Sequence, residues 1–107
     1  MTETKIYIGL NDSVEKKQLF ETERYVKVLR GVCSSYKTPF SFTMSEGGYI
    51  HENGEYTREK TLIINLIDTK REIVNGIARD LCVLFHQESV MITENLVRTY
   101  YVKERLE

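Results

Sequence analysis

The segment TLIINLI, at residues 61–67, constrains the fold of this chain more than any other stretch. The side chains of an extended strand alternate between its two faces, and this run is apolar on both of them. Such a strand is typical of the centre of a sheet that is covered on both sides. The segments around it must therefore supply flanking strands and a layer that packs on the sheet.

The flanking segments alternate between strand and helix patterns. Apolar residues recur at steps of two in some segments and at steps of three and four in others, which distinguishes strands from amphipathic helices. The expected elements are a strand at 5–10, a helix at 22–36, a strand at 40–44, a hairpin at 49–57 leading into 61–67, a helix from 69 to about 87, and a strand at 89–93. This order is the split βαβ pattern of a ferredoxin-like α+β fold, in which both helices cover one face of a four-stranded antiparallel sheet.

The length of 107 residues is that of one domain, so a single ferredoxin-like α+β domain is expected over residues 1–107. The first and third strands of this fold are central, which agrees with the apolar run. The opposite sheet face has no helices, and Tyr7, Ile63 and Ile67 are expected on it. An open apolar face predicts a homodimer or a bound ligand. The segment 97–102, a last strand or arm, is another candidate for the cover of this face.

The hairpin at 49–57 is the strongest local signal in the sequence. Asn53-Gly54 is typical of a tight two-residue turn between two β-prone arms. Two glycines just before it, in the segment 46–48, predict a bulge or a sharp bend. The pairs expected across the turn are His51 with Tyr56, and Tyr49 with Arg58.

Charge, hydropathy and cysteine spacing exclude several classes of protein. The net charge is −1 and the pI is about 6.1, which argues against a basic nucleic-acid-binding protein. No stretch approaches the roughly 18 apolar residues of a membrane span, and the first residues do not resemble a signal peptide. A cytoplasmic protein without a nucleic-acid or membrane partner is therefore expected. Cys33 and Cys82 lack CxxC spacing and are expected to be small buried residues.

His86 and Glu88 form the first candidate site, in the segment FHQESVMITE at 85–94. A histidine next to a carboxylate can act as a general base, so both are candidate catalytic residues for proton transfer. Residues two apart on a helix do not face each other, so the pair requires that the helix has ended before Glu88. The alternative, which the pattern favours, is a histidine stabilised at the helix C-terminus, with Glu88 and Ser89 bonded to backbone groups at the corner.

The hairpin and the strand after it carry the second candidate site. The candidate ligand-binding residues are Tyr49, His51, Tyr56, Arg58 and Glu59. A guanidinium group matches the oxygens of a carboxylate or phosphate, so Arg58 is the expected clamp for an anionic ligand beside tyrosine hydroxyls. One alternative is a solvated hairpin with ordinary cross-strand aromatic pairs. Another is a structural bond to the segment at 85–94, from Arg58 to Glu88 or from Glu59 to Gln87.

Other chemistries lack their sequence signatures. The two histidines have no partner at metal-ligand spacing, so no metal site is expected. No GxSxG nucleophile motif is present, and no GK[ST] follows the glycines at 47–48. No cofactor is expected either.

Three short motifs together resemble a bacterial family known only as domain of unknown function 3574. The matching residues are Tyr7 to Gly9 in the first strand, Gly54 with Arg58 to Lys60 in the hairpin, and Gln87 to Val90 after the second helix. The resemblance covers residues 5–93. The chain departs from the family pattern in having no tryptophan, no proline after Glu59, and a different final segment. The resemblance implies no activity, but it draws attention to Arg58, Glu59 and the segment 87–89 at the corners of the sheet.

Two classes of function follow as hypotheses. The first is a small binding or assembly module, acting as a homodimer or on a protein partner, a class that includes phage and mobile-element proteins. The second is a small dimeric enzyme acting on an anionic small molecule, with Arg58 as the anion clamp and His86 or Glu88 as the proton-transfer group. Convergence of Arg58, Glu88 and a tyrosine on one cavity would favour the enzyme.

Overall fold

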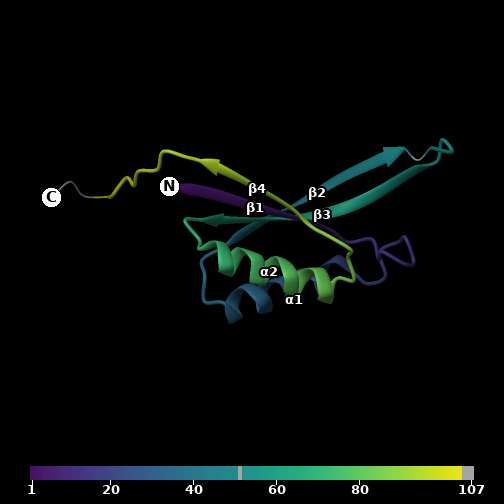
Figure 1. Ribbon diagram of the computed structural model, residues 1–107, viewed down its shortest axis with the longest axis horizontal. Helices are drawn as coiled ribbons and strands as arrows, with labels where there is room; N and C mark the ends of the chain where they lie inside the picture. Colours follow the sequence, from purple (N-terminus) through teal and green to yellow (C-terminus); the bar gives the residue numbers. More distant parts are fainter. Residues whose placement is uncertain (51, 105–107) are drawn as a thin grey trace.

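The computed structural model describes residues 1–50 and 52–104, without the side chain of Tyr49. Within these residues the chain forms six elements, in the order strand, helix, two strands, helix, strand (Figure 1). Their bounds are β1 Thr2–Gly9, α1 Thr22–Ser35, β2 Ser41–Ile50, β3 Tyr56–Ile67, α2 Arg71–Leu84 and β4 Met91–Leu96.

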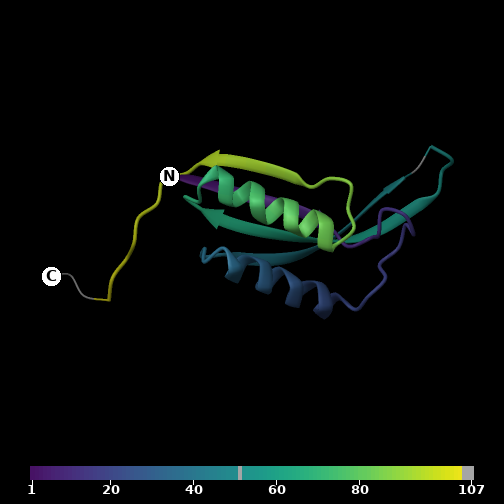
Figure 2. The same ribbon diagram turned by 60° about the horizontal axis from the view of Figure 1, so that its bottom comes forward.

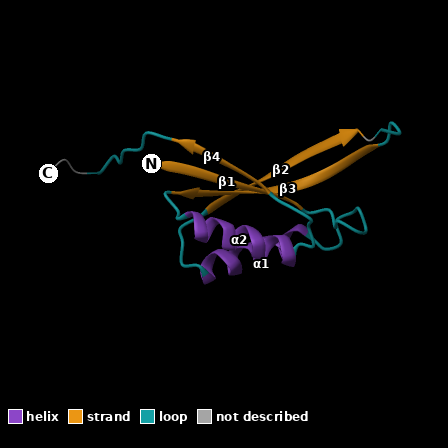
Figure 3. Cartoon of the chain, viewed as in Figure 1, coloured by secondary structure: helices purple, strands orange, loops and turns teal. Residues whose placement is uncertain are grey.

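The four strands form one antiparallel sheet in the order β2-β3-β1-β4. Both helices lie on the same side of this sheet (Figure 3). Figure 2 shows them side by side along the sheet. The arrangement confirms the predicted ferredoxin-like α+β fold, with the first and third strands in the centre.

The core lies between the helices and the inner face of the two central strands. Ile6 and Ile8 of β1, and Leu62, Ile64 and Leu66 of β3, are all 0% exposed. Each set alternates along its strand, so both strands present one apolar row to the helices. The helix residues that share this core are Tyr25, Val26, Leu29, Val32, Cys33, Val74, Ile77, Ala78 and Leu81. Neither described helix is long and apolar enough to cross a membrane.

The outer face of the sheet is less covered than the sequence predicts. Ile63 is half-buried and Ile67 is 46% exposed, so the expected cover on both faces of β3 is wrong for the single chain. Residues 97–104 contain no strand and extend away from the body of the molecule (Figures 1 and 2). They form an arm, in which Tyr100 is 80% exposed. In this structure the arm therefore does not cover the sheet.

The hairpin joins β2 to β3 as predicted, but its register differs from the prediction by one residue. Ile50 pairs with Tyr56, so the connection is longer than a two-residue turn. The predicted turn needs a positive φ at both central residues. Gly54 has a φ of 86°, but Asn53 is not among the described residues with positive φ. Its Oδ1 instead accepts the Glu55 N–H at 3.0 Å.

Gly47 and Gly48 lie in a continuously paired part of β2, so the predicted bulge is wrong, whereas the alternative of a sharp bend stays a prediction. They pair in sequence with Glu59 and Arg58 of β3, with no extra residue on either strand. Gly48 instead leaves space for the aromatic ring of Tyr56. A Cβ at this position would overlap the Tyr56 hydroxyl group, so the glycine lets that side chain lie across β2.

Candidate functional site

The candidate site lies where β1 ends. Beyond this point β2 and β3 continue as a two-stranded ribbon, formed by residues 46–50 and 56–60 (Figure 1). The loop at 11–21 follows β1 and is bonded both to the ribbon and to the corner at 85–90 that joins α2 to β4. The site is built from these three segments.

The corner begins where the chain leaves the helical conformation. Leu84 is the last residue of α2, earlier than the predicted end near 87. His86 follows with a φ of 55°, in the left-handed region that often ends a helix. Histidine is one of the few residue types enriched there. The helix has therefore ended before Glu88, as the catalytic hypothesis requires.

His86 faces Asp12 rather than Glu88. Its Nδ1 lies 2.6 Å from Oδ1 of Asp12, and Asp12 is only 6% exposed. The other Asp12 oxygen accepts the backbone N–H groups of Val14 and Glu15, at 2.9 Å each. The Glu15 N–H, followed by the His86 ring, lowers the pKa of the Asp12 carboxyl below its usual value of 3.8. Asp12 is therefore ionised at neutral pH and ties the loop to the corner.

Asn11 connects the ribbon to the corner through its backbone. Its N–H donates to Oε2 of Glu59 at 3.0 Å, and its carbonyl oxygen accepts a hydrogen bond from the side-chain amide of Gln87. Its own side-chain amide donates to the Arg58 carbonyl oxygen at 3.2 Å. We call this set of contacts the Asn11 junction. It links Glu59 to Gln87 through Asn11, in place of the direct bond considered from the sequence.

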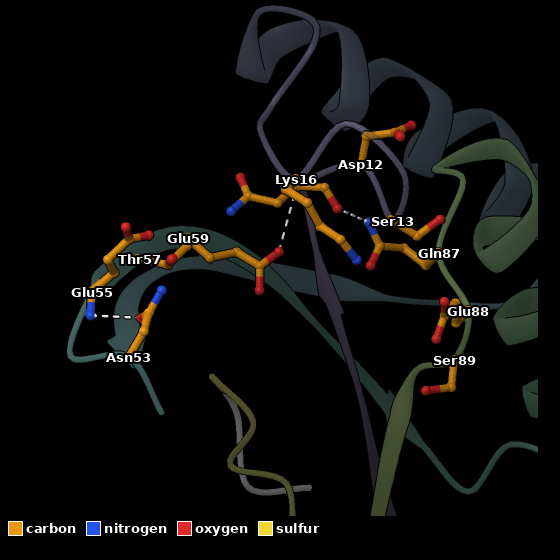
Figure 4. A pocket seen from close by; sticks show the side chains of 11 residues that line it. Asp12, Ser13, Lys16, Asn53, Glu55, Thr57, Glu59, Gln87, Glu88 and Ser89 are labelled. Carbon is orange, nitrogen blue, oxygen red and sulfur yellow. Dashed lines mark hydrogen bonds between the residues drawn. The ribbon is translucent and has the colours of Figure 1, made fainter. Parts of the chain in front are cut away.

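An open cavity of about 620 Å³ lies beside the Asn11 junction. Figure 4 shows Glu59 entering it from the ribbon, with Glu88 and Ser89 on the opposite wall. Four carboxylates and one lysine line it among the described residues, namely Asp12, Glu55, Glu59, Glu88 and Lys16. We call it the acidic cavity. Its excess of negative charge favours a cationic ligand.

A second cavity, of about 530 Å³, lies along the ribbon. Tyr56, Arg58 and Lys60 are among its lining residues. The Arg58 guanidinium is 3.8 Å from a carboxylate oxygen of Glu46, which is too long for a hydrogen bond. The Arg58 side chain is 78% exposed, so it is open to solvent and not held in a buried structural bond.

The structure divides the predicted site residues between the two cavities. Glu88 lines the acidic cavity, whereas Arg58 and Tyr56 line the second. Glu59 lines both. Arg58, Glu88 and a tyrosine therefore do not converge on one cavity in the described part of the chain.

The remaining predicted residues have other positions. His86 is absent from the described lining of both cavities and acts on the site through Asp12. The side chain of Tyr49 and the whole of His51 lie outside the described residues. No group of three or more His, Cys, Asp or Glu residues that could hold a metal ion is found in the part of the chain that the structure describes.

The sequence analysis does not identify Asn11 and Asp12 as site residues. The available signal is the turn cluster NDS at 11–13, because an aspartate in such a cluster accepts the backbone N–H groups that follow it. The partner of Asp12 is 74 positions away in the chain. Only the fold brings the two side chains together.

The fold and the cavity together define a small α+β protein with an open acidic cavity where the central strand β1 ends. No protein-family model and no curated protein matches the chain. Among solved structures, the chain is similar to a phage SAM lyase in complex with S-methyl-5′-thioadenosine, with a TM-score of 0.66 and 25% identity. That match covers 88% of this chain and 79% of the lyase.

Two further solved structures are similar to the chain to different degrees. A phage SAM lyase in the apo state has a TM-score of 0.63 and 24% identity, over 99% of this chain and 92% of the lyase. The periplasmic divalent cation tolerance protein CutA from Archaeoglobus fulgidus has a TM-score of 0.49 and 18% identity, over 92% of this chain and 87% of that one. The chain is thus a small α+β protein with phage proteins among its structural neighbours. The resemblance to domain of unknown function 3574 stays a prediction.

Proposed function

We propose that this chain binds S-adenosylmethionine (SAM) and cleaves it as a lyase, with release of S-methyl-5′-thioadenosine. The observation that carries the proposal is the similarity to the phage SAM lyase bound to that thioether, at 25% identity over 88% of this chain. A shared fold alone does not define an activity. The proposal therefore also rests on the chemistry of the acidic cavity.

The charge of the acidic cavity suits this substrate. The sulfonium group of SAM is a permanent cation, and Glu55, Glu59 and Glu88 line the cavity. Two opposite unit charges about 4 Å apart attract each other by about 1 kcal/mol in water and about 4 kcal/mol near a protein surface. A single carboxylate beside the sulfonium is thus enough to favour SAM over a neutral thioether by about fivefold or more.

The cleavage step can be carried by the substrate and by carboxylates. The bond between the sulfonium sulfur and the γ-carbon of the amino-acid portion breaks, and its electron pair goes to sulfur, which becomes a neutral thioether. The four-carbon fragment either loses a proton to a base or closes on its own carboxylate, so no water is added. Glu59 and Glu88 line the cavity, and in this proposal they hold the sulfonium and either one accepts the proton in the first case.

The test is incubation of the purified protein with SAM, followed by mass spectrometry of the products. We expect S-methyl-5′-thioadenosine to form faster than in a protein-free control, together with a four-carbon product that has gained no water. Glu59→Gln should lower kcat/KM by about tenfold or more, because it removes one charge beside the sulfonium. Arg71→Gln is the matched control, since Arg71 pairs with Glu94 at the opposite end of α2. Wild-type protein that neither cleaves nor binds SAM would exclude the proposal.

The proposal favours the enzyme over the binding or assembly module. The homodimer, the cytoplasmic location and a protein partner stay predictions. So do the anion clamp at Arg58, which lies in the second cavity, and the catalytic role of His86, whose ring faces Asp12. Native mass spectrometry would test the oligomer and a retained partner or ligand in one experiment.

A further inference from the structure

We infer that Gly9 and Asn11 are positioning residues that hold the Glu59 carboxylate at the wall of the acidic cavity, and thereby let the site distinguish a sulfonium from a neutral thioether. This inference rests on the proposed function. It concerns how one carboxylate is placed, and it names residues that need not touch the ligand.

Gly9 provides the space that the Glu59 carboxylate occupies. A Cβ built at position 9 would overlap that carboxylate, with its Oε1 only 2.7 Å away. The overlapping group is the far end of a flexible side chain, so an alanine can be accommodated if Glu59 moves. Gly9 is not among the described glycines with positive φ, so the backbone itself tolerates alanine. Residue 9 therefore controls the position of Glu59 with little effect on the fold.

Asn11 provides the hydrogen bond that fixes the same carboxylate. Its N–H donates to Oε2 of Glu59 at 3.0 Å. Hydrogen bonds to an ionised acceptor are stronger than neutral ones. Gln87 and the Arg58 carbonyl oxygen hold Asn11 from two further directions, so its N–H has a defined direction. The Glu59 carboxylate thus lies against the backbone of Gly9 and accepts a hydrogen bond from Asn11.

A carboxylate held in this way distinguishes a cationic ligand from a neutral one. The sulfonium of SAM is cationic, whereas the thioether product is neutral and loses the attraction. A Glu59 side chain that is free to rotate would spend part of its time in water, where the attraction is weak. Correct placement therefore raises affinity for the cationic substrate without raising affinity for the product.

The first experiment compares two ligands that differ at the reacting centre. Sinefungin carries an ammonium group where SAM has its sulfonium and is not cleaved, and S-adenosylhomocysteine carries a neutral thioether. Isothermal titration calorimetry gives the ratio of their affinities for each variant. We expect Glu59→Gln and Gly9→Ala each to reduce the preference for sinefungin by about tenfold. The double variant should be no worse than Glu59→Gln alone, because Gly9 acts through Glu59.

Gly47→Ala is the matched control for Gly9→Ala. Gly47 lies opposite Glu59 on the neighbouring strand, and a Cβ there meets no atom within 4 Å. This variant should keep the wild-type preference for sinefungin. Additive losses in the Gly9→Ala/Glu59→Gln double variant, or an unchanged preference in Gly9→Ala, would overturn the inference.

A second experiment does not depend on SAM at all. In the wild type, the backbone amide resonance of Asn11 in a ¹H–¹⁵N spectrum should depend on pH through its hydrogen bond to the Glu59 carboxylate. The dependence should disappear in Glu59→Gln and be strongly reduced in Gly9→Ala, while Gly47→Ala keeps it. If Gly9→Ala weakens the pH dependence of the Asn11 resonance but the wild-type protein does not bind SAM, the proposed function is wrong and the positioning role is supported. If the pH dependence of the Asn11 resonance is unchanged in Gly9→Ala, the positioning role is wrong.

Discussion

Asp12 shows how a single residue joins two distant segments. Its carboxylate is bound by two backbone N–H groups and by His86, so its pKa lies below 3.8 in the folded chain. A lowered pKa means that the ionised form stabilises the fold, and that this stabilisation is present above pH 3.8 and lost as the pH falls through the folded value. We expect Asp12→Asn to lower the Tm by several degrees at pH 7, and the difference from wild type to shrink below about pH 4.

Thermal unfolding followed by circular dichroism at a series of pH values measures this difference. The other groups that face Asp12 are the His86 ring and the N–H groups of Val14 and Glu15. His86→Gln separates the ring from the backbone groups, because it should leave the Glu15 contribution in place. An equal Tm difference at pH 3 and pH 7 would contradict the assignment of Asp12 as a stabilising charge.

Cys33 gives a second prediction at this scale. It is 0% exposed in the core, and burial raises its pKa to about 11. The thiolate is the reactive form, so the folded protein should protect Cys33 from iodoacetamide at pH 8. Cys82 is only partly buried and should react first. Peptide mass spectrometry of briefly alkylated protein checks the order, and early modification of Cys33 would show that the core opens easily.

The site residues divide into those that the sequence predicts and those that it does not. Glu59 and Glu88 are predicted, because Glu59 follows the hairpin signal and Glu88 is a carboxylate close to a histidine in the sequence. The partner of His86 is not predicted, because the sequence suggests Glu88, two positions away, whereas the actual partner Asp12 is 74 positions away. Asn11 acts mainly through its backbone groups. Almost any residue type can make such contacts, so the amino-acid sequence does not reveal them.

At the scale of elements, β3 contributes three fully buried side chains to the core, Leu62, Ile64 and Leu66. Ile64 is 0% exposed and pairs with Ile6 and Phe42 on the neighbouring strands. Truncation of a fully buried isoleucine to alanine costs about 2 to 5 kcal/mol. Ile67 on the same strand is 46% exposed and its truncation should cost less than about 1 kcal/mol. Urea unfolding of both variants measures the two costs, and similar values would contradict the one-sided burial of β3.

The order of elements was predictable, but the register of the ribbon was not. Alternation along 61–67 and helical spacing on either side identify strands and helices, because burial on one face imposes a period. The register depends on the turn, and Asn53 prefers a side-chain bond to the Glu55 N–H over a positive φ. One added residue in the connection shifts every pair by one position. The glycines at 47–48 do not form the predicted bulge, and Gly48 instead leaves room for the Tyr56 side chain.

At the scale of the whole molecule, the chain is far from spherical. Its extents are 61 × 28 × 24 Å, because the ribbon extends from one end and the arm from the other (Figure 1). Tyr101 and Val102 of the arm are 79% and 86% exposed. Segments with so little contact add almost nothing to the stability of a single chain.

Deletion of residues 98–107 should therefore leave the fold intact. We expect the Tm to change by less than about 2 °C, because the described residues of this segment, 98–104, are all exposed. Deletion of residues 92–107 is the contrasting variant, since it removes the pairing of Ile92 with Ile6 on the edge of the sheet, and it should unfold at a clearly lower temperature. The sequence predicts a homodimer through the outer face of the sheet, and on that prediction the shorter deletion should keep the sedimentation behaviour of the full chain. A large loss of Tm or of oligomer mass on removing only 98–107 would mean that the arm packs against another copy in solution.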